Sequence, residues 1–294
     1  MTISGVLTAM ITPFDASGAL NEEAAARLMH HLLNNGSDGL VLAGTTGESP
    51  TLSEEEMVRL WRLGVAECGD GTVVAGAGSN DTRHAVHLTE LATDAGVDAV
   101  LVVAPYYNKP NRRGLLEHYR AVAAATDRPV ILYNIPSRSV IDMPNEFLTE
   151  LAAEIPNVAA VKQARFEDIA PIEGLDLLAG NDDKFAETLD LGGTGGILVA
   201  SHLVGTEMRR MIDEPEARHE IHESLRDLFK ALVVTTSPIP VKAALNMLGH
   251  DVGGLRLPLV EASEEEKEVV REAMERHGLR GAEGAAARPV GREV

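Results

Sequence analysis

The feature that most constrains this chain's fold is a repeated alternation between short apolar runs and longer amphipathic segments. Each run is rich in Val, Ile and Leu and has the length of a strand, and a segment with helical periodicity follows it. This pattern is typical of parallel strands that are buried on both faces and joined by helices. The runs recur eight times, at residues 5–11, 39–43, 72–77, 98–103, 129–133, 158–162, 176–179 and 195–199.

Eight strand–helix units predict an α/β fold, a (β/α)8 TIM barrel with a C-terminal helical appendage. The units fill a little over 200 residues, which suits a closed barrel, although an open doubly wound sheet is the alternative. Beyond residue 218 the periodicity is purely helical. We therefore expect a barrel domain over residues 1–218, a helical region over 219–281 and a flexible tail over 282–294.

Composition excludes several classes of function. The 294 residues include 45 acidic and 26 basic side chains, and the net charge of -19 would repel nucleic acid. The longest apolar stretch, residues 99–105, is far shorter than the ~20 residues that cross a bilayer. The single cysteine, Cys68, has no partner for an intramolecular disulfide, which fits a reducing compartment. We expect a globular cytoplasmic protein with no membrane contact.

Lys162 is the strongest candidate for a nucleophile among the six lysines. It ends the apolar run at 158–161, so we expect it at the end of a buried strand, on the face where barrels carry their active sites. Burial disfavours the charged ammonium and makes the neutral amine available for attack. The alternative is a structural lysine whose amine reaches solvent. The other five are interpreted as ordinary surface or loop lysines, including Lys242 near a predicted helix start.

Two further strand ends carry polar side chains. Residues 44–49 combine two glycines with Thr45 and Thr46, so the loop either binds an anion such as a carboxylate or is a simple turn. Tyr133 ends the fifth predicted strand, and Arg138 follows five residues later. A phenol there can carry protons, and the alternative is aromatic packing beside a solvated arginine.

We expect no metal site and no bound cofactor. The histidine pairs His84/His87 and His219/His222 each share a helix face, but neither is accompanied near a strand end by a carboxylate at metal-ligand spacing. The glycine-rich segments at 78–81 and 192–196 do not fit the dinucleotide-binding pattern.

Taken together, these segments resemble the pyruvate-dependent class I aldolases of the N-acetylneuraminate lyase family. The resemblance spans nearly the whole chain and is carried by the loop at 44–48, the motif at 133–136 and the Val161–Lys162 pair. It implies that Lys162 forms a covalent imine with pyruvate, that Tyr133 is catalytic, and that no other cofactor is needed. The reaction implied is that of a lyase.

Arg138 resembles the arginine with which one branch of this family binds the carboxylate of L-aspartate 4-semialdehyde. That branch joins pyruvate to this aldehyde in the biosynthesis of lysine and diaminopimelate, and the same substrates are implied here. The family's pyruvate-binding positions match Thr46, Gly180 and Ile197.

The resemblance also implies a proton relay and an oligomer. Thr45 links Tyr133 to Tyr107, which reaches the site of a neighbouring subunit in the family. A homotetramer built from two dimers is therefore expected.

Two other functions remain open at this point. A sister enzyme would use the same imine on N-acetylneuraminate or a 2-keto-3-deoxy sugar acid, or act as a dehydratase, and Arg138 argues against it. A non-catalytic barrel would bind a keto acid as a sensor, and the presence of Lys162 with its tyrosines argues against that.

Overall fold

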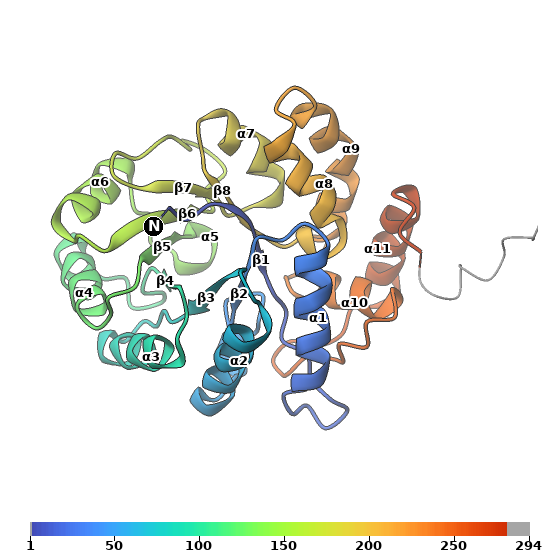
Figure 1. The fold of residues 1–294 in the computed structure, drawn as a ribbon, viewed down its shortest axis with the longest axis horizontal. Helices are drawn as coiled ribbons and strands as arrows, with labels where there is room; N and C mark the ends of the chain where they lie inside the picture. The colour runs from blue at the N-terminus through green and yellow to red at the C-terminus, as the bar shows by residue number, and fades with distance from the viewer. Residues whose placement is uncertain (1, 281–294) are drawn as a thin grey trace, which may run out of the picture.

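The computed structural model describes residues 2–280, and a closed barrel of eight parallel strands lies at its centre (Figure 1). The strands follow one another around the barrel in sequence order, and β8 pairs with β1 through Val6 opposite Gly196. This last pairing closes the sheet, so the TIM-barrel prediction is confirmed and the open-sheet alternative is wrong.

Every predicted strand is present, with ends within two residues of those expected. The differences lie at strand ends, where pairing stops and the sequence pattern carries little information. The strands are β1 (Gly5–Ala9), β2 (Gly39–Leu42), β3 (Thr72–Gly76), β4 (Ala99–Val103), β5 (Val130–Asn134), β6 (Val158–Gln163), β7 (Asp176–Ala179) and β8 (Gly195–Leu198).

Helices surround the barrel, and α9, α10 and α11 gather beside α1 and α8 on one side of it (Figure 1). The helices are α1 (Glu22–Asn34), η1 (Ser49–Thr51), α2 (Glu54–Glu67), α3 (Thr82–Ala95), α4 (Arg112–Ala124), α5 (Pro136–Ser139), α6 (Asn145–Glu154), η2 (Asp182–Lys184), α7 (Phe185–Asp190), α8 (Ser201–Asp213), α9 (Arg218–Ala231), α10 (Ile239–Met247) and α11 (Glu264–Arg276).

The part of the chain after residue 218 is helical, as expected. The boundary between a barrel domain at 1–218 and a helical region at 219–281 stays a prediction. The predicted tail at 282–294 lies outside the described residues. Within residues 2–280, no helix is long and apolar enough to span a membrane.

The side chains of the strands form two apolar layers because successive residues point to opposite faces. One layer fills the barrel interior, where Ile131 and Ala160 meet residues of the other strands. The second layer lies between the sheet and the helices and includes Leu132 and Val161. Tyr133 belongs to the interior layer, and Lys162 follows Ala160 by two residues, so both side chains project inside the barrel near its C-terminal end.

The buried His202 links the residues that follow β8 to the residues that follow β1. His202 is 1% exposed at the start of α8. Its Nδ1 donates to the Val199 carbonyl at 2.8 Å, and its Nε2 accepts from the Ile11 amide at 3.2 Å. Protonation would place an N–H against the Ile11 N–H. Burial is the main cause that lowers the pKa of His202, to about 4.

We expect this histidine to make the fold sensitive to acid. Because the pKa of His202 is lower in the folded chain than its ordinary 6.5, its contribution to stability is complete above pH 6.5 and is lost as pH falls toward 4. His202→Gln should lower stability at neutral pH but reduce the pH slope of the unfolding free energy, by up to about 1.4 kcal/mol per pH unit. Chemical denaturation at several pH values measures the slope.

His277→Gln is the matched control because His277, just after α11, makes no ion pair and no side-chain hydrogen bond within residues 2–280. Its slope should stay that of the unchanged protein. An unchanged slope in His202→Gln as well would contradict the assignment.

Candidate active site

A cavity of about 430 Å³ opens at the C-terminal ends of the strands, the end where barrels of this type hold their chemistry. It collects side chains from the ends of β2, β5, β6 and β7 and from α9. Its lining residues are Thr45, Thr46, Tyr133, Ile135, Ser137, Arg138, Lys162, Phe166, Gly180, Asn181, Asp182, Asp183, Val199, Arg226, Phe229, Lys230, Leu232, Val233 and Ser237.

Lys162 and Tyr133 lie side by side on the cavity floor. They are direct partners in the pairing of β5 with β6, and the Lys162 Nζ lies 4.2 Å from the centroid of the Tyr133 ring. Lys162 is 6% exposed and Tyr133 5% exposed. Within residues 2–280, the Lys162 amine makes no ion pair and donates no hydrogen bond. The arrangement provides a buried amine that is free to react, with a phenol beside it.

The loop after β2 brings Thr45 and Thr46 to the same cavity. The loop is a compact turn in which the Glu48 amide donates to the Thr45 carbonyl at 3.1 Å, and the Ser49 amide donates to the Gly44 carbonyl at 3.2 Å. Gly47 allows close packing, because a Cβ there would lie 3.1 Å from the Met10 carbonyl oxygen. Two threonines of this loop therefore line the same cavity as the Lys162 amine.

Arg138 lies on the short helix α5, which follows β5 directly. Its side chain lines the cavity and is exposed. In the described part of the chain, its guanidinium has no ion-pair partner. By contrast, Arg226, which also lines the cavity, forms an ion pair in which its Nη1 lies 3.3 Å from Glu223 Oε2. The free guanidinium of Arg138 can form a bidentate contact with an incoming carboxylate.

Asp182 is a cavity residue that the sequence reasoning missed. Its Oδ1 accepts hydrogen bonds from the Val199 and Ala200 amides, both at 3.0 Å. Burial raises the pKa of Asp182 to about 6, and the two amides and the nearby Lys162 offset part of that rise. A carboxyl with such a pKa can hold or release a proton near neutral pH. The polar run 180–183 directly after a predicted strand was the available signal.

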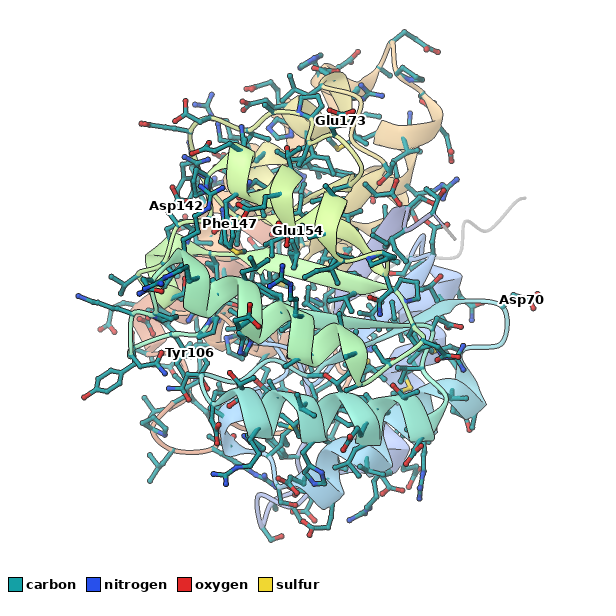
Figure 2. All side chains as sticks on the ribbon, turned by 90° about the vertical axis from the view of Figure 1, so that its left-hand side faces the viewer. Asp70, Tyr106, Asp142, Phe147, Glu154 and Glu173 are labelled. Atoms are coloured by element: carbon teal, nitrogen blue, oxygen red, sulfur yellow. The ribbon has the colours of Figure 1, made fainter. Side chains whose placement is uncertain are left out.

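Gly180 lies in the cavity as predicted, whereas Ile197 and Tyr107 do not line it. Ile197 is fully buried in the barrel interior. Tyr107 is 87% exposed and has a φ of 74°, on the loop between β4 and α4. Its neighbour Tyr106 projects away from the ribbon (Figure 2). The structure of one chain therefore does not bring Tyr107 to Lys162.

The interpretation of Lys242 as an ordinary lysine is wrong. Its side chain is 1% exposed, and its Nζ lies 2.6 Å from Glu48 Oε1. Glu48 belongs to the loop that carries Thr45 and Thr46, and it lies 194 residues away in the sequence. Local sequence patterns do not reveal pairs at such a separation.

The histidines do not assemble a metal centre in the described part of the chain, where no group of three or more potential ligands is arranged to hold an ion. His84 and His87 both contact the carboxylate of Glu54, at 3.1 and 3.3 Å. These contacts lie on α2 and α3, outside the cavity lining.

Comparisons with known proteins agree with this geometry. The 4-hydroxy-tetrahydrodipicolinate synthase of Desulforudis audaxviator is 47% identical, over 90% of this chain and 95% of its own. A dihydrodipicolinate synthase structure from Cyanidioschyzon merolae with lysine bound has a TM-score of 0.90 and 41% identity, covering 94% and 98% of the two chains. A monomeric dihydrodipicolinate synthase variant has a TM-score of 0.88 and 38% identity, covering 94% and 97%.

The model of the dihydrodipicolinate synthetase family matches residues 2–277. This match extends from the first strand through the last described helix, so it includes every strand end that contributes to the cavity. The resemblance seen in the sequence is confirmed, and the chain belongs to the dihydrodipicolinate synthetase family.

Proposed function

We propose that this chain is a lyase that joins pyruvate to L-aspartate 4-semialdehyde through an imine on Lys162. The observation that carries the proposal is the buried Lys162 amine beside the Tyr133 ring, in one cavity with Thr45, Thr46 and Arg138. The relatives named as synthases of 4-hydroxy-tetrahydrodipicolinate support the same substrates.

The first half of the reaction prepares pyruvate as a nucleophile. The neutral Lys162 amine attacks the ketone carbon, and loss of water gives an imine whose nitrogen becomes protonated. This cation draws electrons from the adjacent methyl group, which loses a proton to give an enamine. Thr46 and the loop amides hold the pyruvate carboxylate, and Gly180 and Ile197 shape the pocket around it.

The second half forms the carbon–carbon bond. The enamine carbon attacks the aldehyde carbon of L-aspartate 4-semialdehyde while Arg138 holds the aldehyde's carboxylate. The amine of the adduct then closes on the imine carbon and releases Lys162. The cyclic product feeds the synthesis of diaminopimelate and lysine.

Tyr133, Thr45 and Tyr107 transfer the protons in these steps. Tyr107 is exposed and stands outside the cavity of its own chain, which supports a role in the site of a second copy. We infer a homotetramer made of two such dimers. The mechanism uses no cofactor besides the Lys162 imine, and neither a metal nor nucleic acid takes part. A chain whose one cysteine, Cys68, is free and buried suits the cytoplasm.

The direct test is turnover of purified protein with pyruvate and L-aspartate 4-semialdehyde. Lys162→Arg keeps the charge but removes the nucleophilic amine, so turnover should fall by about a thousandfold or more. Lys230→Arg is the matched control, because Lys230 lines the same cavity without a proposed role. Turnover of a sugar acid instead of the aldehyde would contradict the proposal and indicate a related aldolase with a different substrate.

Arg138 should determine affinity for the aldehyde and not for pyruvate. We expect Arg138→Ala to raise the KM for the aldehyde by about 10- to 100-fold, because a charge-assisted contact is lost. Trapping of pyruvate with borohydride should be unchanged. Arg226→Ala removes the other guanidinium of the cavity, and an equal effect there would contradict a specific role for Arg138.

Tyr107 should act across a subunit boundary. Tyr107→Phe and Lys162→Arg should each have low activity alone. Co-expressed, they should form mixed dimers in which one site has both an intact Lys162 and the partner's intact tyrosine, so activity should return. Mixed dimers without activity would exclude a shared relay.

A further inference from the structure

A buried ion pair connects the substrate loop to the C-terminal helical region. Glu48 closes the loop that carries Thr45 and Thr46, and it is 2% exposed. Its φ of 57° lies in the left-handed region, which is unfavourable for a residue other than glycine. Such a conformation persists only where surrounding contacts hold it in place.

Those contacts come from residues more than 190 positions later in the chain. Lys242 Nζ lies 2.6 Å from Glu48 Oε1, and the Arg256 amide donates to Glu48 Oε2 at 3.0 Å. Lys242 Nζ also donates to the Gly254 carbonyl at 2.7 Å and lies 4.3 Å from the centre of the Phe14 ring. Both ends of the pair are buried, so its geometry is not loosened by competing water.

The Glu48–Lys242 pair also influences the positions of Thr45 and Thr46. The Glu48 amide donates to the Thr45 carbonyl, and the Thr12 hydroxyl donates to the Gly47 carbonyl at 2.7 Å. A shift of Glu48 would therefore move the turn that presents Thr45 and Thr46 to the cavity. The barrel supplies one anchor of this loop through Thr12, and the C-terminal region supplies the other.

We propose that Glu48 and Lys242 are positioning residues that fix the loop for binding of the pyruvate carboxylate. This inference rests on the proposed function, in which Thr46 holds that carboxylate. The C-terminal region then contributes to catalysis indirectly. Lys242 on α10 and Arg256 in the segment after it contact Glu48 and hold the loop in place. The pair acts on pyruvate and leaves the aldehyde contact at Arg138 unchanged.

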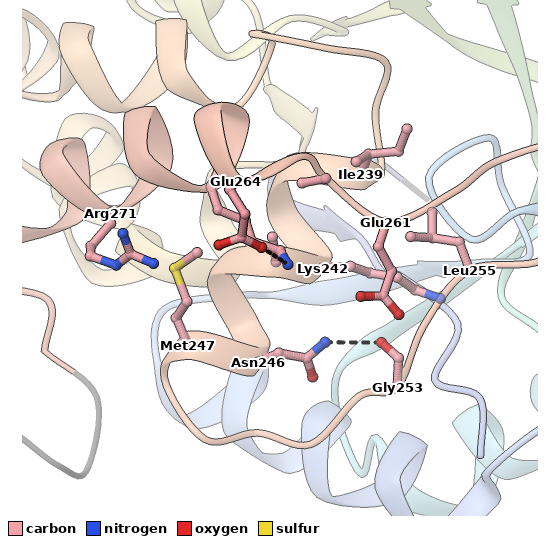
Figure 3. A pocket seen from close by; sticks show the side chains of 12 residues that line it. Ile239, Lys242, Asn246, Met247, Gly253, Leu255, Glu261, Glu264 and Arg271 are labelled. Atoms are coloured by element: carbon pink, nitrogen blue, oxygen red, sulfur yellow. Dashed lines mark hydrogen bonds and ion pairs between the residues drawn. The ribbon is translucent and has the colours of Figure 1, made fainter. Parts of the chain in front are cut away.

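A second cavity, of about 390 Å³, lies between α10 and α11 and borders Lys242 (Figure 3). Its wall includes Ile239, Met247 and Leu255. Truncation of Lys242 to alanine would join new empty space to this cavity and disturb packing. Lys242→Met keeps most of the side-chain length and removes the charge, so it is the better substitution.

The experiment compares Glu48→Gln, Lys242→Met and the double variant with the unchanged protein. Imine formation is followed as borohydride-trapped pyruvate over a range of pyruvate concentrations, and KM is measured for both substrates. We expect each single variant to raise half-saturation by pyruvate about tenfold, with the aldehyde KM within about twofold. The double variant should be no worse than the poorer single variant because both lose one shared interaction.

Lys267→Met is the matched control. It makes the same change as Lys242→Met at another lysine of the second cavity, and it removes the ion pair in which Lys267 Nζ lies 2.8 Å from Glu264 Oε1. Neither Lys267 nor Glu264 contacts Glu48 or Arg256 in the described part of the chain. Pyruvate binding should be unchanged in this control, even if thermal stability falls.

Three results would overturn the inference: unchanged pyruvate saturation in the folded variants, equal changes in both KM values, or the same effect in Lys267→Met. If Glu48→Gln does not fold, the double variant, which leaves no unpaired buried charge, decides the question. Failure of the unchanged protein to trap pyruvate would instead refute the proposed function.

Discussion

The pairing register between β5 and β6 is the constraint on which the active site depends. It sets Tyr133 opposite Lys162, and the alternation of the strands turns both side chains into the barrel. Asn134 reinforces this register from the opposite face, where its Nδ2 donates to Gln163 Oε1 at 3.0 Å and to the Met143 carbonyl at 3.1 Å. A shift by one residue would place the amine outside the barrel, away from the cavity.

The cavity differs in charge from the molecule around it. The chain has a net charge of -19, yet four basic side chains and only two acidic ones line the cavity. Burial favours the neutral form of one of these carboxyls, Asp182. The local excess of positive charge suits substrates that each carry a carboxylate, and it directs them to the end of the barrel where Lys162 lies.

Local sequence patterns were sufficient for the strands, because a strand buried on both faces must be a short continuous apolar run. They also singled out Lys162, Tyr133 and Thr45 near the ends of such runs; all three line one cavity, and their catalytic roles stay predictions. They were insufficient for Lys242, whose burial depends on a contact with Glu48 from a distant part of the chain. Tyr107 is exposed and does not line the cavity of its own chain, so its proposed role in the site of a second copy stays a prediction.

Lys162, and not the other buried lysine, is the proposed nucleophile. Lys242 is more deeply buried, but Glu48 and the Gly254 carbonyl already engage its amine. The most direct measurement is peptide mass spectrometry after incubation with pyruvate and borohydride. We predict one reduced pyruvate on the peptide that contains Lys162 and none on the peptide that contains Lys242. Modification at Lys242, or no modification at all, would contradict the account.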